Sequence, residues 1–234
     1  MGEGTYKIRS SDTMRKGASF TPSFFLFLLS HKLITVWGMS TQTAFVSTET
    51  FTQKEFKRWL DEHPASDINH YELLRGRIVM SPPAGWPHGS VESNIHIPIG
   101  NFVRTHGLGI VLGSSAGYDL PSGDTVEPDI SFIANDRLTA GPAPQPGKFV
   151  KIVPNLVVEI LSPATAQKDR TEKKAIYEEN GVEEYWLVDT KRHEITVYTL
   201  AGKRFGRGKV YTARNTLLSR ALKGFTLRLN EVFV

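Results

Sequence analysis

Apolar and polar residues recur with helical spacing in two parts of the chain. Phe56, Trp59 and Leu60 follow this spacing directly after Thr52-Gln53-Lys54-Glu55, where a hydroxyl and a carboxylate three residues apart can cap a helix. This pattern predicts a helix over about 53–62. A second helix is predicted over 88–106, and we expect Pro98 to kink it.

Short apolar runs predict the strands. Continuous apolar residues at 156–161 are typical of a strand buried on both faces, and a helix over about 166–180, ending before Gly181, follows this strand. The stretch 138–154 is rich in Pro and Gly and is expected to be a loop. Other strands are predicted at 71–74 and 77–80, which form a hairpin, and at about 108–113, 117–120, 128–134, 185–189, 194–200, 204–212 and 225–229. This order predicts an α/β (α+β) fold with a mixed sheet.

The length and the N-terminal segment favour one domain. The 234 residues suffice for a single full-sized domain, and the lack of cysteine excludes disulfides, thiolate metal sites and a cysteine nucleophile, which suits a cytoplasmic location. The apolar run at 20–29 is too short to span a membrane, so no stable membrane association is expected. We predict that residues 1–38 are an extension outside the core and that 39–234 form the domain. An export signal and a structured extension remain alternatives for 1–38.

The positive charge of the chain is unevenly distributed. The net charge is +4, yet residues 39–200 carry a net −6, and residues 201–234 carry a net +7. The overall charge is therefore no argument for nucleic-acid binding, but the basic C-terminal segment is a modest one. Its basic residues could contact phosphates or could form an ordinary solvated strand face; they are Lys203, Arg204, Arg207, Lys209, Arg214, Arg220, Lys223 and Arg228.

Two carboxylates stand in apolar strands, where they need a partner. Glu159 lies inside the apolar run 156–161, and Asp129 begins the run that follows Pro128. A carboxylate buried without a partner costs several kcal/mol (~2–5), so both residues are expected to pair with a cation. If neighbouring strands bring these carboxylates together, a divalent cation would relieve their repulsion, and hard oxygen ligands favour Mg²⁺ or Mn²⁺.

A lysine on the next helix is the third candidate. Lys173 precedes Ile176 and Tyr177 by three and four residues, so it shares their face and points toward the sheet. Such a lysine can orient a metal-bound water or stabilise charge on a phosphate. The alternative from these spacings is that Glu159 and Lys173 form a buried structural ion pair and Asp129 caps a turn.

Three longer sequence segments resemble a known protein family. The segments YELLRGRIVMSPPAGWPH, VEPDISFI and PNLVVEILSPATAQKDRTEKKAIYEENGVEEYWLVDTKRHEITVY resemble the restriction endonuclease family of the Uma-two type, within the PD-(D/E)XK nuclease superfamily. The resemblance implies a restriction-endonuclease-like αβββαβ core with extra N- and C-terminal strands. Its first helix would be 88–106 and its strands would lie near 109, 129, 156 and 185.

The resemblance also implies roles for individual residues. The Pro-Asp of the superfamily falls on Pro128-Asp129, and its Glu falls on Glu159. Leu161 stands where the motif has lysine, and the resemblance implies that Lys173 has taken over this role. Three further residues match family positions with expected substrate or supporting roles: Glu72, His88 and Asp169.

The predicted function is metal-dependent hydrolysis of phosphodiesters, with nucleic acid, DNA in the first place, as the partner. Mg²⁺ or Mn²⁺ would bind Asp129, Glu159 and the backbone carbonyl of Ile160. The alternative is a non-catalytic nucleic-acid-binding or regulatory module, which Leu161 favours; a glycoside hydrolase is a weaker third hypothesis. A homodimer is left open. The predicted contacts to the nucleic-acid backbone are Lys203, Arg204, Arg207 and Lys209.

Overall fold

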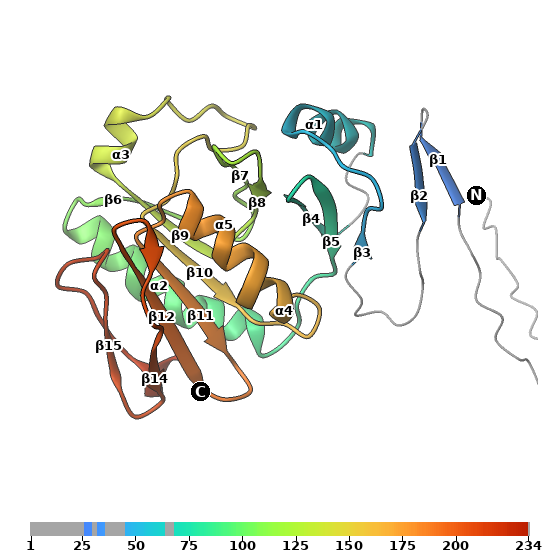
Figure 1. Ribbon diagram of the computed structural model, residues 1–234. Helices are drawn as coiled ribbons and strands as arrows, with labels where there is room; N and C mark the ends of the chain where they lie inside the picture. The colour runs from blue at the N-terminus through green and yellow to red at the C-terminus, as the bar shows by residue number, and fades with distance from the viewer. Residues whose placement is uncertain (1–25, 30–31, 36–44, 64–67, 234) are drawn as a thin grey trace, which may run out of the picture.

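A seven-stranded mixed sheet is the centre of the structure. The computed structural model describes residues 26–29, 32–35, 45–63 and 68–233 (Figure 1). The sheet has the order β13-β12-β11-β10-β9-β6, with β14 also paired to β12. Strand β10 runs parallel to β11 and antiparallel to β9. The strands are β6 (Gly109–Gly113), β9 (Ile130–Ala134), β10 (Leu156–Ile160), β11 (Glu184–Asp189), β12 (Glu194–Ala201), β13 (Arg204–Phe205) and β14 (Lys209–Thr212).

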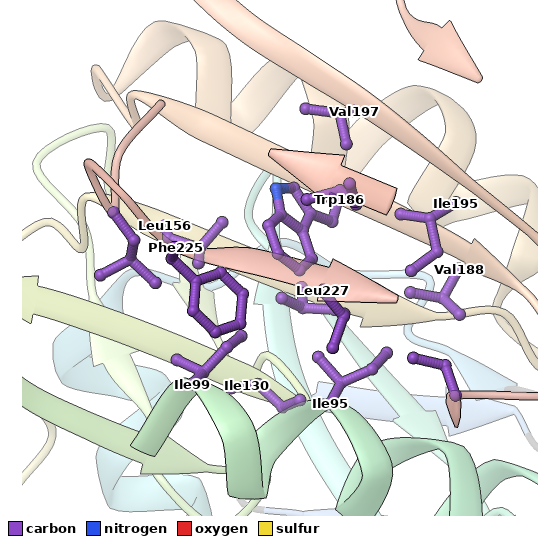
Figure 2. Packing of buried hydrophobic residues seen from close by; sticks show 14 of the residues in the cluster. Ile95, Ile99, Ile130, Leu156, Trp186, Val188, Ile195, Val197, Phe225 and Leu227 are labelled. Carbon is purple, nitrogen blue, oxygen red and sulfur yellow. The ribbon is translucent and has the colours of Figure 1, made fainter. Parts of the chain in front are cut away.

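Helices cover both faces of this sheet (Figure 1). Helix α2 (His88–Thr105) packs Ile95 and Ile99 against one face, where Figure 2 shows them in one cluster with sheet residues such as Trp186. Helix α5 (Lys174–Glu179) packs Ile176 and Tyr177 against the other face. Because side chains alternate along a strand, the five strands β6, β9, β10, β11 and β12 contribute to both clusters.

A second, smaller sheet lies beside the first. Its strand order is β3-β5-β4-β8-β7, and α1 (Gln53–Glu62) buries Phe56 against Leu73 and Ile78 of this sheet. The strands are β3 (Phe45–Val46), β4 (His70–Leu74), β5 (Arg77–Ser81), β7 (Tyr118–Asp119) and β8 (Thr125–Val126). Leu74, Val79 and other residues of this sheet share a hydrophobic cluster with α5, so the two sheets are packed together.

The C-terminal segment closes the α2 side of the core. Strands β15 (Thr216–Leu218) and β16 (Thr226–Arg228) pair with each other, and the 3₁₀ turn η2 (Leu229–Glu231) follows. Figure 2 shows Phe225 and Leu227 of this segment in contact with the cluster around α2. The buried carboxylate of Glu184 anchors the segment by accepting the backbone N–H groups of Arg220, at 2.5 Å, and Ala221, at 2.8 Å.

Part of the N-terminal segment is described. Strands β1 (Leu26–Leu29) and β2 (Lys32–Thr35) form an antiparallel pair that is a sheet of its own. The other residues of the predicted extension 1–38 lie outside the described residues, so its separation from the domain stays a prediction. Within the described part of the chain, no helix is both long and apolar enough to cross a membrane.

The predicted αβββαβ core is confirmed as α2, β6, β9, β10, the α4–α5 segment and β11. One predicted helix needs correction: 166–180 is α4 (Ala166–Lys168), a π-helical turn η1 (Asp169–Lys173) and α5. The predicted loop 138–154 begins inside a short helix, α3 (Asn135–Ala140). The predicted strand 204–212 is divided into β13 and β14, and the sequence patterns missed β3, β8 and β15.

Candidate active site

Glu159 is held between a lysine and a tyrosine. Alternation along β10 places Val157, and hence Glu159, on the face covered by α5. Lys173 Nζ lies 2.6 Å from Glu159 Oε1, and the Tyr177 hydroxyl donates a 2.6 Å hydrogen bond to the same oxygen. Burial raises the pKa of Glu159 well above its ordinary value, although the charge of Lys173 acts in the opposite direction.

Lys173 is the cation of a buried carboxylate cluster. Its Nζ lies 2.8 Å from Glu72 Oε1 and 3.9 Å from Asp169 Oδ1, in addition to the contact with Glu159. Desolvation by burial lowers the pKa of Lys173, but the three carboxylates raise it more, and the resulting pKa lies well above the ordinary value. The amine is therefore charged and can donate hydrogen bonds, but it cannot act as a base.

An irregular helical turn carries two members of this cluster. Asp169 and Lys173 are the first and last residues of the π-helical turn η1, and both side chains are buried. A π-helical turn inserted into an α-helix is rare and is often found at functional sites. The side chains of this turn reach the cluster from the face opposite α2.

The small sheet supplies Glu72. This residue lies on β4, and its Oε1 accepts both the Lys173 contact and the backbone N–H of Glu127, at 2.8 Å. Glu127 precedes Pro128 and Asp129, so the hydrogen bond connects β4 to the segment that enters β9. The cluster is thus assembled from both sheets and from the helical segment between β10 and β11.

Asp129 lies beside Glu159 at the start of β9. Val158 pairs with Ile130 at the end of the antiparallel register, so continuation by one position would set Glu159 opposite Asp129. Asp129 Oδ2 accepts the backbone N–H of Ile160 at 2.6 Å. The carboxylate therefore fastens the entry of β9 to the end of β10 and does not cap a turn, which corrects that part of the alternative interpretation.

The first turn of α2 adds an imidazole and another carboxylate. His88 Nε2 lies 3.3 Å from Asp129 Oδ2, and Glu92 follows His88 by four residues on the same helix face. The possible ligand atoms of His88, Glu92 and Asp129 all lie within 4.8 Å of one another. Burial lowers the pKa of His88, but the hydrogen bond with Asp129 and the charges of Asp129 and Glu92 together outweigh it, so this pKa is raised. Burial raises the pKa of Glu92.

Asp169 is the least satisfied carboxylate of the site. Within the described residues its Oδ1 is buried and has no hydrogen-bond partner, since Lys173 lies 3.9 Å away. Burial raises the pKa of Asp169 to about 6. This oxygen is a candidate acceptor for a water molecule or for a group of the substrate.

These side chains line a single cavity of about 180 Å³. The structure brings together every residue predicted for catalysis, metal binding or a supporting role; these are Glu72, His88, Asp129, Glu159, Asp169 and Lys173. Ile160 also lines the cavity, and its N–H group donates to Asp129. That its carbonyl binds the metal stays a prediction. The predicted Glu159–Lys173 ion pair is present as well.

A larger groove adjoins the cavity. It has a volume of about 470 Å³ and lies between the loop from β5 to α2 and the segment that follows β10. The groove and the cavity share Pro82, Pro83, Ala84, His88 and Ser162. Most of its remaining lining is apolar, with Arg170, Asp189 and Lys191 as its charged residues.

The predicted backbone contacts lie elsewhere. Arg204 is opposite Ala201, at the end of the sheet away from Glu159, and Lys209 lies three strands from β10, or about 14 Å at the usual strand spacing. Lys203, Arg204, Arg207 and Lys209 are all exposed, and none lines the cavity or the groove. Their contact with nucleic acid stays a prediction that the geometry of the site does not support.

Comparison with protein families identifies the chain. Residues 53–230 match the family model Uma2, described as "Putative restriction endonuclease". The chain belongs to the Uma2 family. Among solved structures, a protein of Anabaena variabilis described as "a putative nuclease belonging to DUF820" is similar, with a TM-score of 0.66 and 18% identity over 78% of this chain and 97% of that one. No curated protein matches the sequence.

These comparisons confirm the predicted family and the restriction-endonuclease-like fold. Membership of the Uma2 family supports a nuclease-like function for the chain, and hence a nucleic acid as its substrate class.

Sequence patterns missed two members of the site. Glu92 lies four residues after His88, so helical spacing places the two side chains on one face of α2. Tyr177 had been used to define the inward face of the helix, and its hydroxyl proves to bind Glu159. In both cases an i, i+4 pair with a predicted site residue was the available signal.

Proposed function

We propose that this Uma2 protein is a metal-dependent phosphodiester hydrolase that acts on DNA. The observation that carries the proposal is the charge of the cavity. Lys173 faces Glu72, Glu159 and Asp169, and Asp129 and Glu92 line the same cavity, so carboxylates outnumber the one lysine. A buried excess of negative charge is costly unless a cation or protons compensate it.

The side chains present fit a divalent metal ion. His88, Glu92 and Asp129 offer an imidazole nitrogen and two carboxylates within 4.8 Å, and both described contacts of the neighbouring Glu159 use Oε1, which leaves Oε2 as its candidate ligand atom. Carboxylates with room for water suit Mg²⁺, and an imidazole in the set favours Mn²⁺. When bound, such an ion would polarise the phosphodiester and lower the pKa of a bound water.

Lys173 would act through hydrogen bonds and charge. Its raised pKa keeps the amine protonated, so it can orient a water molecule or stabilise negative charge that develops on the phosphate. Glu72 and Glu159 hold Nζ in place at 2.8 Å and 2.6 Å. The bond from Ile160 N–H to Asp129 fixes the other carboxylate in the same way. The groups are thus positioned before substrate arrives, which is a condition for electrostatic catalysis.

The main alternative is a non-catalytic module that keeps the nuclease fold. Leu161 in place of the motif lysine favours it, and so does the ion pair, because a structural pair would need the same contacts. The two functions differ in what Lys173 contributes to turnover. A nuclease needs its charge for cleavage, whereas a binding module needs it only for stability.

The first test measures metal binding without knowledge of the substrate. Thermal unfolding of the full chain is compared with and without Mn²⁺ for wild type, Asp129→Ala and Asp136→Ala, a matched control on the exposed surface of α3. At about ten times Kd, metal binding adds roughly 1.4 kcal/mol, a shift of about 3–6 °C for a domain of this size. We expect this shift in wild type and in the control, and its loss in Asp129→Ala.

Cleavage then separates the two functions. With plasmid and single-stranded DNA and Mn²⁺, we expect Asp129→Ala and Lys173→Met to lose cleavage by at least ~100-fold while circular dichroism shows a folded protein. Absence of a metal shift in wild type would contradict the metal site. A shift together with undiminished cleavage by Lys173→Met would contradict the role of the lysine.

A further inference from the structure

Trp86 is the most exposed large apolar side chain of the described residues, with 85% of its surface accessible. It lies in the loop between β5 and α2, two residues before His88. Tryptophan is usually largely buried, and exposed tryptophan is enriched where a protein binds a partner. The exposed position of Trp86 beside the candidate active site therefore indicates that this side chain contacts a bound ligand.

The groove next to Trp86 has a suitable size and composition for one planar ligand. Its volume of about 470 Å³ is in the range of small-molecule binding sites, and Trp86 is part of its lining. The walls are apolar on both sides, with Pro82, Pro83 and Pro87 from one loop and Leu161 and Pro163 from the segment after β10. Prolines restrict the backbone, so the loop that carries Trp86 has little conformational freedom to lose on binding.

The charged residues of this groove are positive in sum. The groove is lined by two basic residues, Arg170 and Lys191, and by one acidic residue, Asp189. The Asp189 carboxylate forms an ion pair with the Arg170 guanidinium at 2.8 Å. Lys191 is exposed and has no described ion pair among the residues with assigned positions. The adjoining cavity, in contrast, is rich in carboxylates. An anion is therefore expected to lie in the groove, while a cation is expected in the cavity.

We propose that this groove is a nucleotide subsite in which an unpaired base stacks on Trp86 and the phosphate next to it lies near Arg170 and Lys191. The proposal rests on the proposed function, since the shared residues His88 and Ser162 place this nucleotide next to the one at the cavity. In a duplex both faces of a base are covered by its neighbours, so Trp86 can stack only on a base that is single-stranded or has left the helix. Single-stranded nucleic acid is the expected preferred ligand.

Binding is measured without metal, so that cleavage does not interfere. Fluorescence anisotropy of a labelled single-stranded 12-mer deoxyoligonucleotide in EDTA gives Kd for the full chain and for Trp86→Ala, Trp86→Phe and Ile97→Ala. Ile97 is a matched control because it is also exposed, at 61%, but lines a different groove along α2. We expect Trp86→Ala to raise Kd about 5- to 100-fold, with Trp86→Phe within about threefold of wild type and Ile97→Ala unchanged.

A set of 12-mers, each with one abasic position, identifies the base. One position should weaken wild-type binding by about the same factor as Trp86→Ala, and the two changes together should add little further. Equal Kd values for wild type and Trp86→Ala would overturn the subsite, as would an equal loss for single-stranded and duplex DNA. Equal Kd values are the result expected if Trp86 binds a protein partner and not a base.

The same measurements distinguish failure of the subsite from failure of the proposed hydrolase function. Wild type that cleaves DNA while Trp86→Ala binds normally would remove the subsite alone. Wild type that binds the 12-mer through Trp86 but never cleaves with Mn²⁺ would support the subsite and remove the hydrolase. No binding by wild type to single-stranded or duplex DNA would overturn both.

Discussion

At the scale of single residues, two buried carboxylates of this chain show when such a group indicates a site. Glu184 is fully buried, but Trp186 Nε1 and the N–H groups of Arg220 and Ala221 satisfy its two oxygens. The carboxylates around Lys173 exceed its charge, and Asp169 Oδ1 has no described hydrogen-bond partner. A buried carboxylate therefore indicates chemistry only where its environment leaves it unsatisfied.

Asp169 should make the metal-free protein less stable at neutral pH. Its pKa is raised from 3.8 to about 6, so the folded state binds the proton more tightly than the unfolded chain does. The stabilising effect of this proton is full below about pH 4 and is lost as the pH rises through 6. We expect Asp169→Asn, which mimics the protonated form, to be more stable than wild type by about 2–3 kcal/mol at pH 8 and equal to it near pH 4.

Urea unfolding in EDTA at several pH values measures this difference, and Asp136→Asn on the exposed surface of α3 serves as the control. The control should show no pH-dependent change of comparable size. If Asp169→Asn is instead less stable at pH 8, the charge of Asp169 is fully compensated by Lys173, and the excess charge assigned to the cavity is too large.

At the scale of elements, local signals in the sequence were sufficient where a helix or strand carries its own pattern. The capping box at Thr52 and Glu55 is present as predicted and begins α1 at Gln53. Gly181 has the positive φ expected after the last helical turn of α5. Pro98 lies within α2, whose buried residues Val91, Ile95, Ile99 and Val103 recur at helical spacing. These features depend on neighbours within a few residues, which the sequence contains directly.

Features that depend on distant contacts could not be read in this way. The π-helical turn at Asp169–Lys173 joins two short α-helical pieces, and its residues hold the contacts to Glu159 and Glu72 from other elements. A regular α-helix and this turn share the same apolar pattern, so periodicity does not distinguish them. The Pro- and Gly-rich composition of 138–154 did not indicate helix α3, because its Pro and Gly residues begin only at Gly141, after the helix has ended. The resemblance to a family was needed for the strands to be placed side by side.

The attachment of the C-terminal segment should depend on Glu184. Its oxygens accept the N–H groups of Trp186, Arg220 and Ala221, so Glu184→Gln would direct an amide NH₂ at a donor and leave buried groups unpaired. We expect a loss of about 2–3 kcal/mol in the free energy of unfolding, measured with urea. Glu194→Gln, which removes only an exposed ion pair with Arg192, should cost less than about 1 kcal/mol. An equal cost for the two variants would contradict the anchoring role.

At the scale of the whole molecule, the site lies where the two sheets meet. Glu72 comes from the small sheet, Asp129 and Glu159 come from the large sheet, and Lys173 contacts Glu72 and Glu159. The cavity therefore exists only when both sheets are folded and packed together. This explains why the strand patterns, taken one at a time, gave candidates for the site but not its full composition.

The distribution of charge over the molecule gives the last prediction, because two sets of basic residues could bind nucleic acid. Lys203, Arg204, Arg207 and Lys209 belong to the basic C-terminal part but lie away from the cavity, whereas Arg170 and Lys191 line the groove beside it. Each phosphate contact on single-stranded DNA adds about 0.7 to the slope of log Kd against log salt concentration. The slope therefore counts contacts and distinguishes the two sets.

We expect the double variant Arg170→Ala, Lys191→Ala to lower this slope by about 1.4 and to weaken binding most at low salt. The fourfold change of Lys203, Arg204, Arg207 and Lys209 to Gln removes more positive charge and is thus a stringent comparison, and it should leave the slope within error of wild type. Anisotropy titrations of the same 12-mer from 50 to 300 mM salt provide the measurement. If the fourfold variant lowers the slope by about 2.8 and the double variant has no effect, the nucleic acid follows the C-terminal strands, and the path through the groove is wrong.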